Sequence, residues 1–131
     1  GGYCSDDSSC VNGAICQVDS VPCDMHKKPA WGTAGWIAAQ VPESEILEVV
    51  VYNRGGRHAS LLESFEVWIG NHGGASSNDE GAIRCGPRVQ NAVDPGPFTV
   101  SCGVPLRGSW VTVKKTSVMP IFLAEVEIFG P

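Results

Sequence analysis

The stretch WIAAQVPESEILEVVVYN, from Trp36 to Asn53, indicates how this chain is built. It holds two apolar runs, Trp36–Val41 and Ile46–Tyr52, on either side of the sequence Pro-Glu-Ser. Valine, isoleucine, tyrosine and tryptophan favour strands, whereas proline and serine favour turns. The stretch therefore predicts two short strands separated by a turn.

The same pattern continues toward the C-terminus. Further strands are expected at Ser64–Ile69, Ala82–Cys85, Pro97–Cys102, Ser109–Lys114 and Ile121–Phe129. The segments between them are rich in turn-forming residues, and the chain contains 16 Gly and 9 Pro. Short strands at this spacing predict an all-β fold, an antiparallel β-sandwich. The one stretch with helical character, His58–Glu63, predicts a helical turn that leads into a strand.

A cationic connection follows the opening stretch. Tyr52 leads into the sequence Asn-Arg-Gly-Gly-Arg-His, after which Phe65, Val67 and Ile69 alternate with Glu66 and Trp68. The alternation predicts that Trp68 faces outward, on the same side as Glu66. The apolar segments on either side of this connection, Ile46–Tyr52 and Ser64–Ile69, predict a hairpin whose tip carries the cations. Two interpretations stay open here: a ligand site built from cations, or a solvated turn that needs no function.

Composition excludes several classes of protein. The 131 residues suffice for one domain with a small appendage, and 43% hydrophobic against 18% charged residues indicates a folded chain. The net charge of −5 disfavours nucleic acid as a partner. No apolar run reaches the length of a membrane span. Because the chain begins with Gly1, we expect a processed product or an excised fragment.

Six cysteines are the strongest compositional signal. Four lie near the N-terminus (Cys4, Cys10, Cys16 and Cys23), and the other two are Cys85 and Cys102. Spacings of five and six residues do not fit a zinc knuckle, so disulfides are favoured over a metal site. Disulfides place the chain in an oxidising compartment, secreted or at the cell surface. We expect a disulfide-knotted segment at residues 1–23 and a sandwich domain at residues 24–131.

The N-terminal segment resembles the opening half of small cysteine-rich modules. Cys10 to Cys16 reads C-V-N-G-A-I-C, similar to the CxNGxxC of epidermal-growth-factor-like repeats. Those modules pair the first cysteine with the third and the second with the fourth. The resemblance therefore implies the disulfides Cys4–Cys16 and Cys10–Cys23, although four cysteines allow three pairings.

Five blocks in order, from about Pro22 to Gly130, resemble the F-type lectin (fucolectin) family, which belongs to the discoidin-like, galactose-binding jelly rolls. They include WIAAQVPESEILEVVVYNR, FEVWIGN, the cysteine-containing pair IRCG and FTVSC, and the closing LRGSWVTVKKTSVMPIFLAEVEIFG. The resemblance implies a jelly-roll β-sandwich, a Cys85–Cys102 disulfide and binding of fucose-type glycans. Ala124 replaces a family cysteine, which leaves Cys23 for the N-terminal segment.

The family's sugar motif is only partly present. His26 and Arg54 match its first two members, whereas Gly56 and Leu61 stand where the family has Asp and a second cation. A guanidinium offers a planar fork of donors that suits two neighbouring sugar oxygens. Arg57 and His58, which are absent from the family's pattern, are expected to supply the lost donor. The predicted carbohydrate-binding residues are therefore His26, Arg54 and Arg57.

Calcium is a candidate cofactor, because the resemblance implies a calcium-stabilised fold. Glu125 matches the family's ligand, and four aspartates are candidates for further oxygen ligands: Asp6, Asp7, Asp19 and Asp24. The other interpretation is that Glu125 is an outward strand residue and that the aspartates form turns.

Three function classes compete. The first is an extracellular lectin-like domain whose partners are glycans or glycoproteins. The second is a structural module that has lost sugar binding and assembles an extracellular polymer or cell-surface coat, as a homo-oligomer or with other proteins. The third is a carbohydrate-binding appendage of a larger enzyme or receptor. An enzyme is not expected, because neither G-x-S-x-G nor H-E-x-x-H occurs.

Overall fold

The computed structural model describes residues 17–18, 21–22, 24–27, 35–53, 59–60, 62–77, 79–117, 121 and 123–131, with backbone only for 17–27, 124 and 125. The strands are β1 (Gln17–Val18), β2 (Val21–Pro22), β3 (Asp24–Lys27), β4 (Trp36–Asn53), β5 (Glu63–Gly70), β6 (Ile83–Arg84), β7 (Val89–Ala92), β8 (Phe98–Lys115) and β9 (Leu123–Phe129). Every pairing between them is antiparallel. The described residues therefore form an all-β fold, as predicted.

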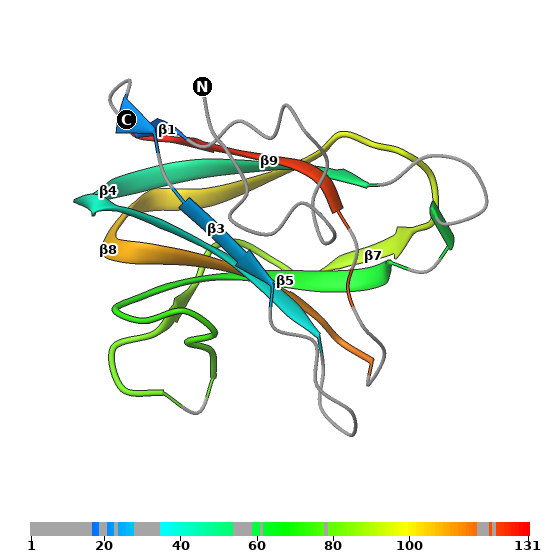
Figure 1. Cartoon of the computed structure of the whole chain (residues 1–131), viewed down its shortest axis with the longest axis horizontal. Coiled ribbons are helices and arrows are strands. Elements are labelled where there is room, and N and C mark those ends of the chain that lie inside the picture. The colour runs from blue at the N-terminus through cyan, green and yellow to red at the C-terminus, as the bar shows by residue number, and fades with distance from the viewer. Residues whose placement is uncertain are drawn as a thin grey trace.

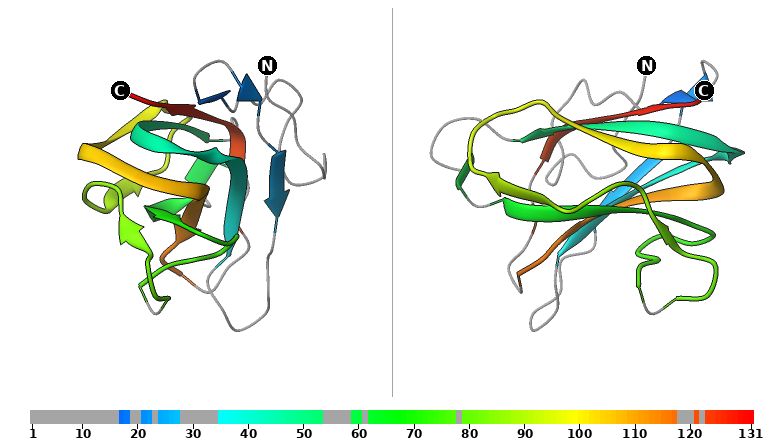
Figure 2. Two further views of the ribbon diagram at one scale, coloured as in Figure 1. Left: turned by 90° about the vertical axis from the view of Figure 1, so that its left-hand side faces the viewer. Right: turned by 180° about the vertical axis from the view of Figure 1, so that it is seen from behind.

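Two long strands belong to both layers of the sandwich (Figures 1 and 2). One layer contains β3, the first part of β4, the second part of β8, and β5 with β6 and β7 at its edge. The other layer contains the first part of β8, the second part of β4, and β9. The sheet is continuous because β4 and β8, of 18 residues each, fold over from one layer to the other.

Irregular register explains why both strands can bend. In β4, the pairing with β8 jumps between Gln40 and Ser44, and Pro42 lies in the gap, where it has no N–H to donate. In β8, the extra residues opposite the second jump include Gly103, with φ of +82°, and Pro105. A left-handed backbone suits glycine. We call this part of the sandwich, residues 41–44 and 102–108, the bulge end.

The core lies between the two layers. Alternate residues of the strands point inward and are almost fully buried, as the strand period requires. They include Val49, Val51, Phe65, Val67, Ile69, Val111, Val113, Val126 and Ile128. Phe65 and Phe98 meet edge to face, with ring centroids 6.0 Å apart. Each large apolar side chain buried here contributes about 1.5–3 kcal/mol relative to an exposed one.

The segment after β5 packs against the outer face of the sheet. The backbone N–H of Gly74 donates to Oγ1 of Thr112 at 3.1 Å, and Nζ of Lys114 donates to Oγ of Ser76 at 3.1 Å. A Cβ added at Gly74 would lie 2.6 Å from the Trp36 ring. Glycine is therefore required where this segment crosses the tryptophan.

The predicted hairpin is wrong. β4 and β5 do not pair, because β8 lies between them in the strand order. The residues after Asn53 therefore connect two layers rather than two neighbouring strands. Apolar alternation shows that a segment is a strand but does not identify its partner, which is why the sequence did not exclude a hairpin.

The observed strands confirm some of the other expected elements and correct the rest. The two runs of the opening stretch are one strand, β4, and the expected strands Pro97–Cys102 and Ser109–Lys114 are likewise one strand, β8. β7 was not predicted. A turn does form near His58–Glu63, where Leu62 N donates to Ala59 O at 3.4 Å. Among the described residues, no helix is long and apolar enough to cross a membrane.

Candidate functional site

One end of the sandwich gathers the termini of several strands. Because β4 folds back, its first and last residues lie toward the same end, in different layers (Figures 1 and 2). β5 and β9 begin there, and β8 both begins and ends there. We call this the Asn53 end, after the last residue of β4. It is opposite the bulge end and leads directly into the predicted cationic connection.

Asn53 is a buried junction. Its side chain is almost fully buried, and its Nδ2 donates to the carbonyl oxygens of Ala59 (2.7 Å), Asp94 (3.0 Å) and Ala92 (3.4 Å). Its backbone N–H donates to Pro95 O at 3.0 Å. One side chain therefore joins Asn53 to Ala59, the described residues on either side of 54–58, and ties both to the end of β7 and the segment after it. The sequence placed Asn53 in the lectin-like block but assigned it no role.

Lys115 is a second buried polar group at this end. Its side chain is 1% exposed, and Nζ lies 3.8 Å from Oε1 of Glu63. Burial lowers the pKa of Lys115, and the negative charge of Glu63 opposes that effect. Sequence reasoning missed this residue, although the alternation of Val111, Val113 and Lys115 was a signal that Lys115 faces the core.

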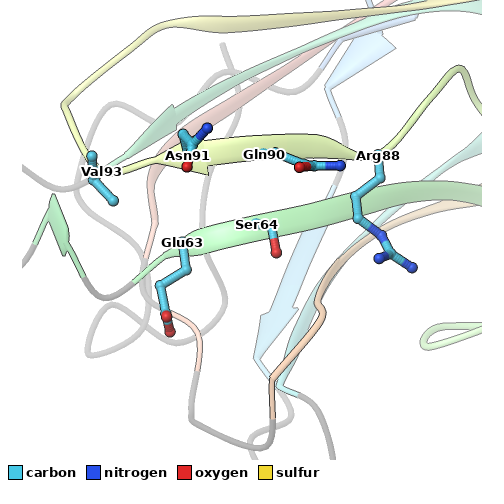
Figure 3. Close-up of a pocket in the computed structure, with 6 residues that line it drawn as sticks. All are labelled: Glu63, Ser64, Arg88, Gln90, Asn91 and Val93. Carbon is cyan, nitrogen blue, oxygen red and sulfur yellow. The ribbon is translucent and has the colours of Figure 1, made fainter.

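An open polar pocket of about 340 Å³ lies between β5 and β7 (Figure 3). Its lining residues are Glu63, Ser64, Arg88, Gln90, Asn91 and Val93. The register between the two strands is irregular here, and Glu63 and Asn91 have left-handed backbones, with φ of 60° and 58°. Sequence reasoning did not find this pocket, because it depends on the unpredicted strand β7.

A charged cluster on the outer face extends from this pocket. One oxygen of Glu66 accepts from Nε and Nη2 of Arg88, at 3.1 and 2.9 Å, and contacts Arg84 at 3.5 Å. Nε1 of Trp68 donates to the other oxygen at 3.1 Å. Burial alone would raise the pKa of Glu66, but these hydrogen bonds and the two positive charges lower it below its ordinary value. The outward position of Trp68, beside Glu66, is confirmed.

The predicted sugar-site residues are only partly described. His26 lies in β3, where its backbone pairs with Ala38 of β4, and its side chain is outside the described structure. Arg54 and Arg57 also lie outside the described residues. Asn53 nevertheless fixes the position from which Arg54 follows. The site thus stays a prediction, attached to a defined end of the fold.

The other predicted site residues divide in the same way. The disulfide Cys85–Cys102 is present and joins the two layers next to the β8 bulge. The four N-terminal cysteines, Cys4, Cys10, Cys16 and Cys23, lie outside the described residues. Glu125 pairs with Tyr52 through the backbone, but its side chain is not described. Within the described part of the chain, no group of three or more His, Cys, Asp or Glu side chains is placed to hold a metal.

Solved structures share this fold. The lectin domain of lectinolysin, complexed with Lewis b antigen, matches with a TM-score of 0.62 and 23% identity over 82% of this chain and 72% of that one. A fucolectin from striped bass (Morone saxatilis) serum matches with a TM-score of 0.60 and 24% identity over 82% of this chain, which spans 36% of the fish protein. An F5/8 type C domain from Bacteroides fragilis matches with a TM-score of 0.56 and 11% identity over 94% of this chain and 82% of that one.

These likenesses show that the chain has the fold of F-type lectin and F5/8 type C domains. No protein-family model and no curated protein matches the sequence. The matched lectin domains are non-catalytic binding modules, and this chain shares their fold.

Proposed function

We propose that this chain is an extracellular, lectin-like module that binds fucose-bearing glycans at the Asn53 end. The observation that carries the proposal is the fold, which is shared with a fucolectin and with a lectin domain complexed with Lewis b antigen. The lectin-like sequence block from Trp36 to Arg54 supports it, because this block ends at the buried junction of Asn53.

The proposed binding residues are His26, Arg54 and Arg57. An arginine fork donates to two adjacent hydroxyls, and a histidine N–H donates to a third. Gly56 and Leu61 occupy the positions where the lectin motif has Asp and a second cation. Arg57 takes over the donor role in this proposal. Asn53 donates to the carbonyl oxygen of Ala59, so the two described residues that flank the connection are fixed relative to each other, which supports a binding site at this place.

Calcium is a secondary proposal. Glu125, with aspartates of the N-terminal segment, would supply the oxygen ligands that calcium prefers. The extracellular setting is supported by the Cys85–Cys102 disulfide, since such bonds persist in oxidising compartments.

The test is a glycan array probed with the whole chain, once with calcium and once with chelator. We expect binding to fucosylated glycans, lost in Arg54→Ala and weakened in Arg57→Ala. Arg107→Ala is the matched control, because Arg107 is an exposed arginine at the bulge end. A blank array from folded protein, or equal binding by Arg54→Ala, would refute the proposal. If binding is lost only when the chelator is present, glycan binding depends on calcium.

A second candidate function is assembly without sugar binding. Val104 and Phe129 are large apolar side chains that are 60% and 41% exposed, and Phe129 lies on β9 at the border of its layer. Exposed apolar groups near a sheet edge favour contact with another chain. The mass of the native particle tests this candidate: a stable oligomer together with a blank array would favour it over the lectin.

A further inference from the structure

We infer that the pocket between β5 and β7 is a second saccharide subsite, separate from the Arg54 connection. The class of ligand rests on the proposed function, whereas the geometry of the pocket stands independently of it. The pocket is open and lies at the Asn53 end, since Glu63 is the first residue of β5 (Figure 3). Asn53, the last described residue before the connection, donates to the carbonyl oxygens of Ala92 and Asp94, on either side of the lining residue Val93. The two proposed sites would therefore be neighbours that one branched glycan could occupy.

Three polar residues that line the pocket each interact with a residue outside it. Arg88 is fixed by two hydrogen bonds to Glu66, whose side chain is only 14% exposed. Glu63 faces the buried ammonium of Lys115. The hydroxyl of Ser64 is hydrogen-bonded to that of Thr116. Side chains fixed in this way lose little conformational freedom when they bind a ligand, which is the usual requirement for a precise site.

The same residues retain unused hydrogen-bonding capacity. Arg88 uses Nε and Nη2 of its five-donor fork on Glu66, and Glu63 contacts Lys115 through one of its two oxygens. The amides of Gln90 and Asn91 add donors and acceptors along β7, and the half-exposed Val93 adds an apolar surface (Figure 3). One cation, one anion and two amides favour a neutral ligand with many hydroxyls, each of which both donates and accepts.

Backbone strain is concentrated at this pocket. Glu63 and Asn91 are the non-glycine residues with positive φ among those described, and both line it. A left-handed glutamate is costly, and such strain persists mainly where the surrounding structure holds it, often at functional sites. The irregular β5–β7 register brings both residues to the same edge.

A second polar pocket gives the contrast. At the bulge end, Glu43, Ser44, Glu45, Arg107 and Pro131 line an open pocket of about 270 Å³. It also contains an arginine–glutamate pair, but both side chains are more than 60% exposed. Its lining has an excess of negative charge. An arginine and a glutamate alone therefore do not distinguish the β5–β7 pocket. What distinguishes it is that its arginine and glutamate are bonded to the largely buried Glu66 and Lys115.

The test is isothermal titration calorimetry of the whole chain with Lewis b oligosaccharide and with methyl α-L-fucoside. We expect Arg88→Gln and Asn91→Gly to raise the dissociation constant for the oligosaccharide by about tenfold and to leave that for the monosaccharide unchanged. Asn91→Gly removes the amide and relieves the left-handed backbone, so it should not unfold the chain. Arg107→Gln is the matched control, and Arg54→Ala should weaken the binding of both ligands.

The outcomes separate the two proposals. If both pocket variants bind the oligosaccharide as the wild type does while Arg54→Ala fails, the subsite is refuted and the proposed function stands. If the pocket variants fail while Arg54→Ala binds normally, the subsite stands and the Arg54 site is refuted. If the wild type binds neither ligand, both are refuted. Thermal melting of each variant confirms that a loss of binding is not a loss of fold.

Discussion

The two ends of this sandwich are fixed by different means. At the bulge end, Gly103 supplies an unusual backbone angle, a disulfide joins the layers, and the Arg107–Glu43 pair is exposed. At the Asn53 end, two polar residues are almost fully buried: Asn53 is 3% exposed and Lys115 is 1% exposed. Burying polar groups is costly unless they are bonded, so a chain uses them where it must fix particular segments. The comparison indicates that the Asn53 end is built to hold connections in place.

The largest effect is expected from breaking the Asn53 junction. Asn53→Ala removes three side-chain hydrogen bonds and leaves buried carbonyl oxygens without a donor, which should lower the free energy of unfolding by about 4 kcal/mol. Chemical denaturation measures it. Asn53→Asp keeps the shape but cannot donate when ionised, so it should cost at least as much. A loss below about 1 kcal/mol in both variants would mean that Asn53 is not the anchor.

The disulfide is the corresponding test at the bulge end. The double variant Cys85→Ala with Cys102→Ala releases the link between the layers, across a sequence separation of 17. Loop-closure entropy predicts a loss of roughly 3 kcal/mol, measured by urea unfolding. The core should persist, with the near-ultraviolet circular dichroism retained below the melting point. An unchanged melting temperature in reductant and in the double variant would contradict this account.

Glu66 gives an effect that depends on pH. Its pKa is lower in the folded chain than its ordinary value of 4.5, so its contribution to stability is complete above that value. The contribution is lost as the pH falls through the folded pKa. Glu66→Gln should cost about 2 kcal/mol near neutral pH, where it removes charge-assisted hydrogen bonds, and should flatten the acid side of the stability profile. Urea unfolding across that range tests it; identical acid slopes for variant and wild type would refute it.

The smallest effect is expected at the exposed ion pair of the bulge end. Arg107→Gln or Glu43→Gln should change the free energy of unfolding by less than about 0.5 kcal/mol, because solvent screens the pair. The same urea titrations measure the change. A loss comparable with that of Glu66→Gln would remove the contrast between the supported and unsupported pairs.

Apolar alternation and cysteine content predicted much of the fold. The β-rich class, the outward position of Trp68 and the Cys85–Cys102 link follow from local patterns or from resemblance to a lectin family. The pairing of β8 between β4 and β5 did not follow, because strand order depends on contacts distant in sequence. β7 was missed because VQNA has too few apolar residues to stand out.

The candidate site was less predictable than the fold. Arginines in a glycine-rich connection draw attention in any sequence, whereas a buried asparagine or lysine is recognised only when its surroundings are known. The support of Arg88 by Glu66 joins residues 22 positions apart, one on β5 and one immediately before β7. Such a contact depends on the β5–β7 register, which no local pattern encodes.

The most direct test of a binding site at the Asn53 end is hydrogen exchange, followed by mass spectrometry, with and without Lewis b oligosaccharide. Protection should rise in residues 54–64 and 88–95, which carry the proposed site and subsite, and stay unchanged in residues 41–45 and 103–108. Equal exchange with and without ligand, under conditions that saturate the proposed site, would contradict the account. So would protection confined to the bulge end, which would place the ligand at the opposite side of the fold.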